Sequence, residues 1–442
     1  MIKLPEQVNK AICLLKNSGF EAYAVGGAVR DCLLGKVPFD WDITTSARPE
    51  ETEKVFCGER IIETGIKHGT VTVIIDGMPL EITTYRIDGD YTDHRHPQTV
   101  SFSDNLRDDL SRRDFTINTL CCNCDDKIID AFGGKDDLKN KIIRCVGDPD
   151  TRFSEDALRI MRAVRFSAEL GFKIEKNTSD SILKNRQLLS DVSKERLQVE
   201  FTKLITGKYA TDVIRKYHAV IEVFIPELAP LAECEQHTKY HKYDVFEHTL
   251  HAVDAIDFND RILRLTMFFH DFGKPDAKTT DENGTSHFKG HAVISEKKTR
   301  DILKRLKFDN NTINEVSKLV LIHDMKSPRD KIQAKKMMCS LGDETYLNLL
   351  KIKRADNMAK ADPHAIDEKL KNMRSFYEEI KINNECYNLK SLAVNGDDIK
   401  AFGIAEGKEI KSSLDFLLNG VIEGKCQNRK DVLLEYLKEN TK

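Results

Sequence analysis

Short runs of β-branched and apolar residues alternate with helix-like stretches over roughly the first 150 residues of the chain. The runs are bounded by Gly or Asp-Gly, and Asp76-Gly77 has the composition of a tight hairpin turn. A helix ending at Leu34 and stopped by Gly35 is expected after the first run. The pattern predicts strands at Glu21–Val25, Phe39–Thr44, Ile61–Glu63, Thr70–Ile75 and Leu80–Arg86.

From about Ser154 onward, Glu, Lys, Leu, Ile and Arg dominate, glycine becomes scarce and helical periodicity runs to the end. Pro226 and Pro230 indicate a boundary near 220, and Asp362-Pro363 indicates another near 360. We therefore expect an α+β protein, in which an α/β head with a mixed sheet precedes an elongated all-helical remainder. Its expected parts are a head (1–150), a neck (151–220), a body (221–360) and a tail (361–442).

Composition narrows the class of protein further. The 442 residues are 40% hydrophobic and 32% charged, with a net charge of −3, which excludes a globally basic polyanion binder but leaves room for a local basic face. An apolar run of about 18 residues is missing, and MIKLPEQVNK lacks a signal-peptide core, so we expect no membrane partner and a cytoplasmic protein. The 11 cysteines are interpreted as reduced thiols, including the dense group Cys121, Cys122 and Cys124.

Two carboxylates follow a glycine pair in the head. Asp40 and Asp42 are two apart in a predicted strand, so their side chains are expected on one face. Mg²⁺ prefers such oxygen ligands together with substrate phosphates. Gly26-Gly27 lets the backbone approach a phosphate at the mouth of a helix. The combination predicts a site for a nucleoside triphosphate and a metal, although an Asp-x-Asp alone is also typical of a solvated strand.

Basic residues next to a carboxylate and an amide recur in the segment from Arg112 to Asn118, which reads Arg-Arg-Asp-Phe-Thr-Ile-Asn. Guanidinium groups bind phosphate through paired hydrogen bonds, and Asp114 suits a ribose hydroxyl. A helix N-terminus with solvated charges is the alternative interpretation of the same segment.

These residues resemble a known family. The block Gly-Gly-Ala-Val-Arg-Asp followed by Asp-Trp-Asp, and the Arg-Arg-Asp segment, are similar to motifs of the bacterial and eukaryotic tRNA nucleotidyltransferases and of bacterial poly(A) polymerases. Three further blocks follow in the family's order: 130–148 (Asp-Ala-Phe-Gly-Gly to Gly-Asp), 155–162 (Glu-Asp-Ala-Leu-Arg-Ile-Met-Arg) and 193–196 (Ser-Lys-Glu-Arg).

The resemblance implies that Asp40 and Asp42 hold two Mg²⁺ ions, which activate the 3′-hydroxyl of an RNA primer and stabilise the leaving pyrophosphate. Glu81 is a weaker candidate for a third acid. The implied partners are the tRNA 3′ end, CTP and ATP. The residues implied to bind nucleotide are Gly26, Gly27, Arg30, Arg112, Arg113, Asp114, Asn118, Asp156, Arg159 and Arg162.

Base choice without a nucleic-acid template is assigned to Asp156 and Arg159, which are three apart and expected on one helical face. A carboxylate accepts and a guanidinium donates, so the pair suits cytosine and adenine, which present an amino group beside a ring nitrogen. Uracil and guanine present a carbonyl there, and each unpaired polar group costs about 1–3 kcal/mol. A surface ion pair between the two residues is the alternative.

Three activities share these motifs: addition of CCA, addition of only part of that end, and poly(A) synthesis. The segment 88–100 resembles the flexible loop of enzymes that add all three nucleotides. Poly(A) polymerases of this family tend to be basic, whereas this chain is slightly acidic. We therefore expect CCA addition, with A-only addition or poly(A) synthesis as alternatives.

A second constellation lies in the body. His248, the adjacent pair His270-Asp271 and the later Asp356 resemble the metal-binding motif of HD-superfamily phosphohydrolases. The resemblance implies one divalent ion held by these four residues, with His291 and His323 available to a second. Imidazole and carboxylate together suit a transition metal better than Mg²⁺ alone. A protein that is mainly such a phosphohydrolase is the alternative of a different class.

Overall fold

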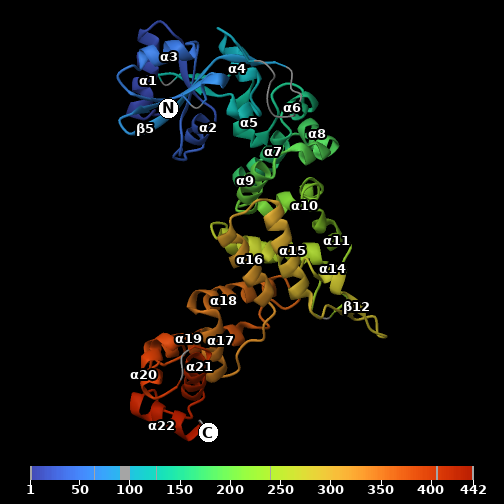
Figure 1. The fold of residues 1–442 in the computed structure, drawn as a ribbon. Coiled ribbons are helices and arrows are strands. Elements are labelled where there is room, and N and C mark those ends of the chain that lie inside the picture. The colour runs from blue at the N-terminus through green and yellow to red at the C-terminus, as the bar shows by residue number, and fades with distance from the viewer. Residues whose placement is uncertain are drawn as a thin grey trace. The chain divides into compact units, whose positions relative to one another are not determined.

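The structure is a computed structural model that describes residues 2–63, 65–89, 100–125, 127–238, 240–404 and 407–440. It contains two compact units, Met1–Ala229 and Pro230–Lys442 (Figure 1). The boundary between them falls between Ala229 and Pro230, and the predicted division into four parts, with a boundary near 220, stays a prediction. Among the described residues, no helix has the length and apolar character needed to cross a bilayer.

A seven-stranded mixed sheet forms the head of the first unit. Its strand order is β3-β4-β5-β2-β1-β8-β9; β2 and β5 run parallel, and the other pairs are antiparallel. The strands are β1 (Ala22–Val25), β2 (Asp42–Thr45), β3 (Arg60–Ile62), β4 (Thr70–Ile75), β5 (Met78–Thr84), β8 (Cys121–Cys122) and β9 (Ile128–Ile129). The helices and the further hairpin around it are α1 (Glu6–Asn17), α2 (Gly27–Leu33), α3 (Pro49–Val55), α4 (Leu106–Ser111), α5 (Gly134–Asn140), β6 (Arg86–Asp88) and β7 (Val100–Phe102).

The turn between β4 and β5 agrees with the sequence prediction. Asp76 and Gly77 have φ values of 47° and 82°, the left-handed pair that a two-residue hairpin requires. Val71, Val73 and Ile75 are buried on one face of β4, as strict alternation predicts.

The second strand was predicted incorrectly. It begins at Asp42, not at Phe39, so Asp40 lies before the strand. The reason is the neighbouring chain: Val25 is the last residue of β1 and pairs with Asp42, after which Gly26 turns at φ 80° into α2. Strand β1 therefore has no residue to pair with Asp40. Because Asp40 lies outside a strand, the alternation of side chains along a strand does not predict which way its carboxylate points.

Helices complete the first unit. They are α6 (Pro149–Glu155), α7 (Leu158–Leu170), α8 (Lys176–Asn185), α9 (Lys194–Ile205) and α10 (Ala210–Ile221). Helix α7 packs against α9 and α10, and Val164 of α7 and Phe201 and Leu204 of α9 are fully buried. It also contacts the head through the edge-on packing of Phe166 on Phe115.

The second unit is almost entirely helical. Around its histidines pack α12 (Val245–Asp254), α13 (Arg261–Phe269), α15 (His291–Arg305), α16 (Asn310–Ile322) and α18 (Asp343–Met358). One apolar cluster joins α17 (Lys331–Leu341), α18 and α19 (Asp367–Ile382), and another joins α20 (Gly396–Ala401), α21 (Lys408–Ile422) and α22 (Lys430–Asn440). With the mixed sheet of the head, these helices confirm the predicted α+β class.

Candidate active site and candidate metal centre

Three carboxylates lie together at the start of β2. Asp42 is in register with Glu81 on the parallel strand β5, and Asp40 lies two residues earlier. Loss of water contacts raises the pKa of Asp42 to about 6, against the opposing charge of Arg113, and the neighbouring charges of Glu81 and Asp40 raise it further. The negative charge of these three carboxylates thus exceeds the positive charge of Arg113, and their oxygen atoms are suitable ligands for Mg²⁺.

The glycine pair abuts this acid group. Gly26 has φ 80° and ψ −136°, a conformation that side chains disfavour. A Cβ atom on it would lie 3.1 Å from Nη1 of Arg113 and 3.7 Å from Oδ2 of Asp42. Gly27 follows as the first residue of α2. Glycine is therefore required at position 26, because a side chain there would crowd the Arg113 guanidinium and approach the Asp42 carboxylate.

A buried acid that the sequence analysis missed orients the two arginines. Asp109 accepts hydrogen bonds from Arg112 at 2.7 Å and from Thr44 of β2 at 2.9 Å, and it lies 3.4 Å from Arg113. Burial opposes its charge, but the two guanidinium groups hold the pKa of Asp109 below its usual value. Its spacings of three and four residues from the arginines, on one helical turn, were the signal in the sequence.

The predicted nucleotide ligands Arg30, Asp114, Asn118 and Arg162 form one buried network. Arg30 donates to Oδ1 of Asn118 at 2.7 Å, Asn118 donates to Asp114 at 2.9 Å, and Arg162 donates to the other Asp114 oxygen at 2.7 Å. Despite complete burial, Arg162 and Asn118 hold the pKa of Asp114 at about 2. The network links the glycine-pair helix α2 to α7, and a direct nucleotide contact by its members stays a prediction.

The predicted shared helical face of Asp156 and Arg159 was wrong. Asp156 ends α6 with φ −134° and ψ 101°, so the helix breaks before Arg159. Asp156 accepts from Arg196 of α9 at 2.9 Å, whereas Arg159 donates to Glu155 at 2.6 Å and to the carbonyl of Arg112 at 2.8 Å. The aspartate's own backbone geometry thus separates the pair, and each of the two side chains has another partner.

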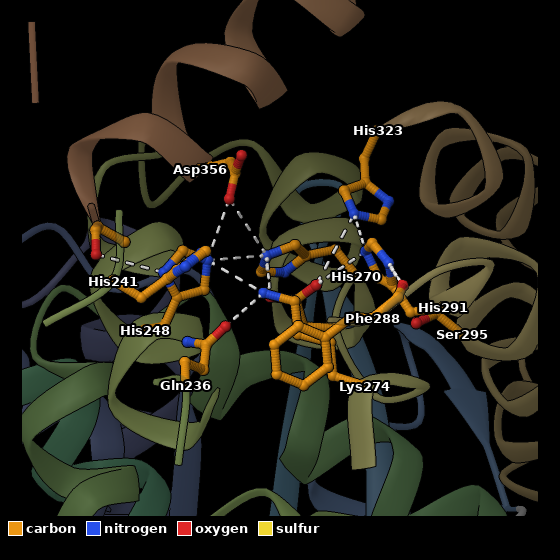
Figure 2. Close-up of polar contacts among 12 residues, drawn as sticks. Gln236, His241, His248, His270, Lys274, Phe288, His291, Ser295, His323 and Asp356 are labelled. Atoms are coloured by element: carbon orange, nitrogen blue, oxygen red, sulfur yellow. Dashed lines mark hydrogen bonds and ion pairs between the residues drawn. The ribbon is translucent and has the colours of Figure 1, made fainter. Parts of the chain in front are cut away.

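The residues of the second constellation converge although they lie on separate helices. Nε2 of His248 lies 3.0 Å from Asp356 and 3.4 Å from both Asp271 and Nε2 of His270 (Figure 2). On the other side of Asp271, Nε2 of His291 lies 3.4 Å from the second carboxylate oxygen and 3.1 Å from Nε2 of His323. Asp271 therefore belongs to two adjoining groups of candidate metal ligands.

The four imidazoles in this centre share one orientation. Their Nδ1 atoms lie against backbone carbonyl oxygens, at 2.6 Å in His270 and His323, 2.8 Å in His291 and 3.3 Å in His248. A carbonyl oxygen only accepts, so each Nδ1 carries a proton and each Nε2 points inward, where it can bind a metal ion once it is unprotonated. In metal sites, backbone carbonyls that accept from Nδ1 orient histidine ligands in this way.

Two lysines lie at the edge of the same centre. Lys274 donates to Gln236 at 2.7 Å (Figure 2) and lies 2.7 Å from Asp271. Lys360 lies 2.6 Å from Asp356. Although burial opposes it, His270 and Lys274 hold the pKa of Asp271 well below its usual value, so this carboxylate is charged. Burial, with the nearby charge of His270, lowers the pKa of His323 to about 3, so this imidazole is neutral.

The fold and the acid site define a nucleotidyltransferase, and sequence comparison agrees. Residues 22–144 match the family described as "Poly A polymerase head domain" and residues 171–231 match "Probable RNA and SrmB- binding site of polymerase A". Residues 279–437 match "tRNA nucleotidyltransferase domain 2 putative".

The chain belongs to the family of CCA-adding enzymes. It is 32% identical to the CCA-adding enzyme of Lactobacillus helveticus (99% of this chain, 98% of the relative) and 34% identical to that of Ligilactobacillus salivarius (99% and 97%). Its fold is similar to the crystal structure of the Bacillus stearothermophilus CCA-adding enzyme in complex with CTP, with a TM-score of 0.72, 30% identity and coverage of 98% and 96%. The predicted resemblance to tRNA nucleotidyltransferases is confirmed.

Proposed function

We propose that the chain builds and repairs the CCA end of tRNA by transferring two CMP units from CTP and then one AMP unit from ATP to the 3′-hydroxyl, with release of one pyrophosphate at each addition. The observation that carries the proposal is the acid group of Asp40, Asp42 and Glu81 beside Gly26 and Arg113, in a chain that aligns over nearly its whole length with CCA-adding enzymes.

Mg²⁺ is the proposed cofactor of the acid group. The raised pKa of Asp42 reflects desolvation and the charges of Glu81 and Asp40, and a divalent cation relieves this crowding. Asp40 and Asp42 would hold the ion, which when bound lowers the pKa of the primer hydroxyl and screens the triphosphate. Asp109 already holds Arg112 and Arg113 in place, so their positive charges could bind the phosphates without a further loss of side-chain entropy.

Base choice is proposed to remain with Asp156 and Arg159, through an exchange of partners. Asp156 is partly accessible, with 20% of its side chain exposed, and it has Arg196 as its partner. A cytosine or adenine amino group would take the place of the Arg196 guanidinium. The carbonyl of uracil or guanine would face a carboxylate that accepts but cannot donate. Arg162, joined to Asp114, keeps α7 aligned with the head.

The direct test is the product made from tRNA that lacks its CCA end, with CTP and ATP, resolved at single-nucleotide length. We expect growth by three nucleotides and then a stop. Growth by a single A on a tRNA already ending in CC, with no C added to shorter primers, would indicate an A-adding enzyme. Unlimited growth would indicate a poly(A) polymerase. No growth with any primer contradicts the proposal. The loop segment used to predict full addition lies mainly in 90–99, outside the described residues.

For the second unit, we propose a divalent metal centre built from His248, His270, Asp271 and Asp356. The supporting observation is the pair of facing Nε2 atoms, 3.4 Å apart, in His248 and His270. The carboxylates of Asp271 and Asp356 lie 3.4 Å and 3.0 Å from Nε2 of His248, and burial keeps water from screening their negative charge, so the centre favours a cation. Asp271 and Asp356 supply the balancing charge.

The chemistry of this donor set suits a transition metal, which when bound activates a water molecule for hydrolysis of a phosphate ester. Lys274 and Lys360 place two further cations at its edge, where an anionic substrate would gain from them. A metal-dependent phosphohydrolase activity is therefore the second candidate function, separate from nucleotide addition.

Metal analysis of the purified protein tests this centre. We expect wild type to retain about one or two transition-metal ions per chain and His270→Ala to lose at least one, while CCA addition continues. His287→Ala is the matched control, because His287 is exposed and pairs with Asp281 away from the centre. Equal metal content in wild type and His270→Ala contradicts the proposal. Hydrolysis of 2′,3′-cyclic nucleotides by wild type but not by His270→Ala would assign the activity.

A further inference from the structure

A cavity adjoins the acid group, and the proposed function assigns no ligand to it. It is a cavity of about 640 Å³ with Asp40 in its wall, a volume typical of small-ligand sites. Its walls come from the N-terminal segment, the loop between α2 and β2, and the start of β5. The residues that line it include Lys3, Lys36, Phe39, Asp40, Trp41 and Pro79.

The loop beside this cavity presents unusually exposed apolar side chains. Phe39 is fully exposed, at 103%, and Val37 is 95% exposed. Among the residues that the structure describes, these are the two most exposed large hydrophobic side chains. Trp41, by contrast, is buried at 6% and forms part of the wall. A ligand that packs on this exposed aromatic ring, beside an apolar cavity, would bury a large apolar surface.

The position of the Phe39 ring indicates which molecule would stack on it. Phe39 immediately precedes Asp40, one of the two carboxylates proposed to hold the ion that activates the primer hydroxyl. Phe39 and Asp40 line the same cavity, and in one nucleotide the base and the 3′-hydroxyl are joined through a single ribose, so a base stacked on Phe39 would bring its hydroxyl to the side of the cavity that Asp40 lines. The incoming nucleotide is assigned to the arginines and to Asp156 and Arg159, none of which lines the cavity.

Charge at the cavity also fits a nucleic-acid strand. Lys3 and Lys36 both line it, and Lys36 is exposed. Cations flanking an aromatic platform are the usual arrangement for single-stranded RNA, in which lysines contact phosphates and the ring stacks on a base without regard to sequence. A CCA-adding enzyme needs this tolerance, because its primer ends in a different base before each addition.

We propose that Phe39 is the stacking platform for the 3′-terminal base of the RNA primer, which enters the cavity beside Asp40. This inference rests on the proposed function and adds to it the seat of the primer end. Phe39 is a positioning residue in this account: it holds the nucleotide whose hydroxyl reacts and takes no part in the chemical step.

The test compares two full-length proteins, wild type and Phe39→Ala, on two primers, one intact and one whose 3′-terminal nucleotide lacks its base. Phe39→Ala should raise both the dissociation constant and KM for tRNA lacking CCA about tenfold, the loss of one base–aromatic stack. With a primer whose 3′-terminal nucleotide is abasic, wild type and Phe39→Ala should bind within about twofold of one another. KM for CTP and kcat at saturating primer should change less than twofold, and Phe39→Tyr should restore wild-type binding.

Controls separate the possible failures. Phe258→Ala removes an exposed phenyl group (43%) from the other unit and should leave primer binding unchanged. If wild type adds nucleotides and Phe39→Ala binds the intact primer as tightly as wild type does, the stacking inference is wrong while the proposed function stands. An equal loss on intact and abasic primers also overturns it. So does a change in oligomeric state without a change in primer binding, which would assign the face to a second copy of the chain.

Discussion

Removing the charge of Asp42 should make the metal-free protein more stable, although it removes a ligand. The pKa of this carboxyl rises from 3.8 to about 6 on folding, chiefly through desolvation. A rise of about two units corresponds to at most about 3 kcal/mol, at 1.36 kcal/mol per unit. Asp42 is only partly removed from solvent, since the residue still has exposed surface, so solvent screening reduces this to about 1 kcal/mol. Asp42→Asn should therefore raise the melting temperature of the first unit by about 2–4 °C.

The sign of the pH dependence follows from the same shift. The folded state binds the Asp42 proton more tightly than the unfolded chain does, so wild type loses relative stability as the pH rises from about 4 to about 6. The advantage of Asp42→Asn should be absent at pH 4 and complete above pH 6. Thermal unfolding in EDTA measures it, and Mg²⁺ should stabilise wild type more than the variant.

A matched control isolates the cause of this difference. Asp76→Asn neutralises an exposed acid of the same sheet, in a turn where asparagine accepts the positive φ, and it should lack the pH-dependent gain. An equal melting temperature for Asp42→Asn and wild type at pH 7.5 in EDTA would refute the reasoning. Equal stabilisation of both proteins by Mg²⁺ would refute the assignment of the ligand.

Three further changes test other contacts. Asp114→Ala removes the ion pair of Arg162, whose side chain is 34% exposed and lies 4.0 Å from Glu200, and it takes the acceptor from Asn118; it should lower the free energy of unfolding by about 1–3 kcal/mol, measured by urea denaturation, and an unchanged value would argue against the network. Arg196→Ala frees Asp156 from its partner and should alter the ratio of CTP to UTP incorporation, whereas an unchanged ratio would place base choice elsewhere. Gly26→Ala places a Cβ 3.1 Å from Arg113 at a positive φ, so KM for CTP should rise at least tenfold, and an unchanged KM would contradict the close approach.

Local patterns were sufficient for part of the fold. Strand β4 has the predicted bounds, because alternation and the Asp76-Gly77 turn are properties of neighbouring residues. The start of β2 was misplaced because it depends on where β1 ends, 17 residues earlier in the chain, at Val25 (42 − 25). Sequence periodicity contains no information about the partner strand.

The candidate sites show the same limit. Asp42 and the His248 group were predicted as candidate ligands from their combination with Gly26-Gly27 and with His270-Asp271 and from the family resemblance, and these roles stay predictions. The pairing of Asp156 with Arg196, 40 residues apart, was not identifiable, because a spacing of three favoured Arg159 until the helix break was known. Exposure of Phe39 was equally hidden, since an apolar residue before a strand is ordinarily expected to be buried.

The central claim is that the head's carboxylates carry out nucleotide transfer to tRNA. Single-turnover addition of CTP to tRNA lacking CCA, compared between wild type and Asp42→Asn at saturating substrates, tests it most directly. We predict a loss of at least about a thousandfold in rate, about 4 kcal/mol, with tRNA binding within threefold of wild type. Transfer by Asp42→Asn at a rate within tenfold of wild type would contradict the account.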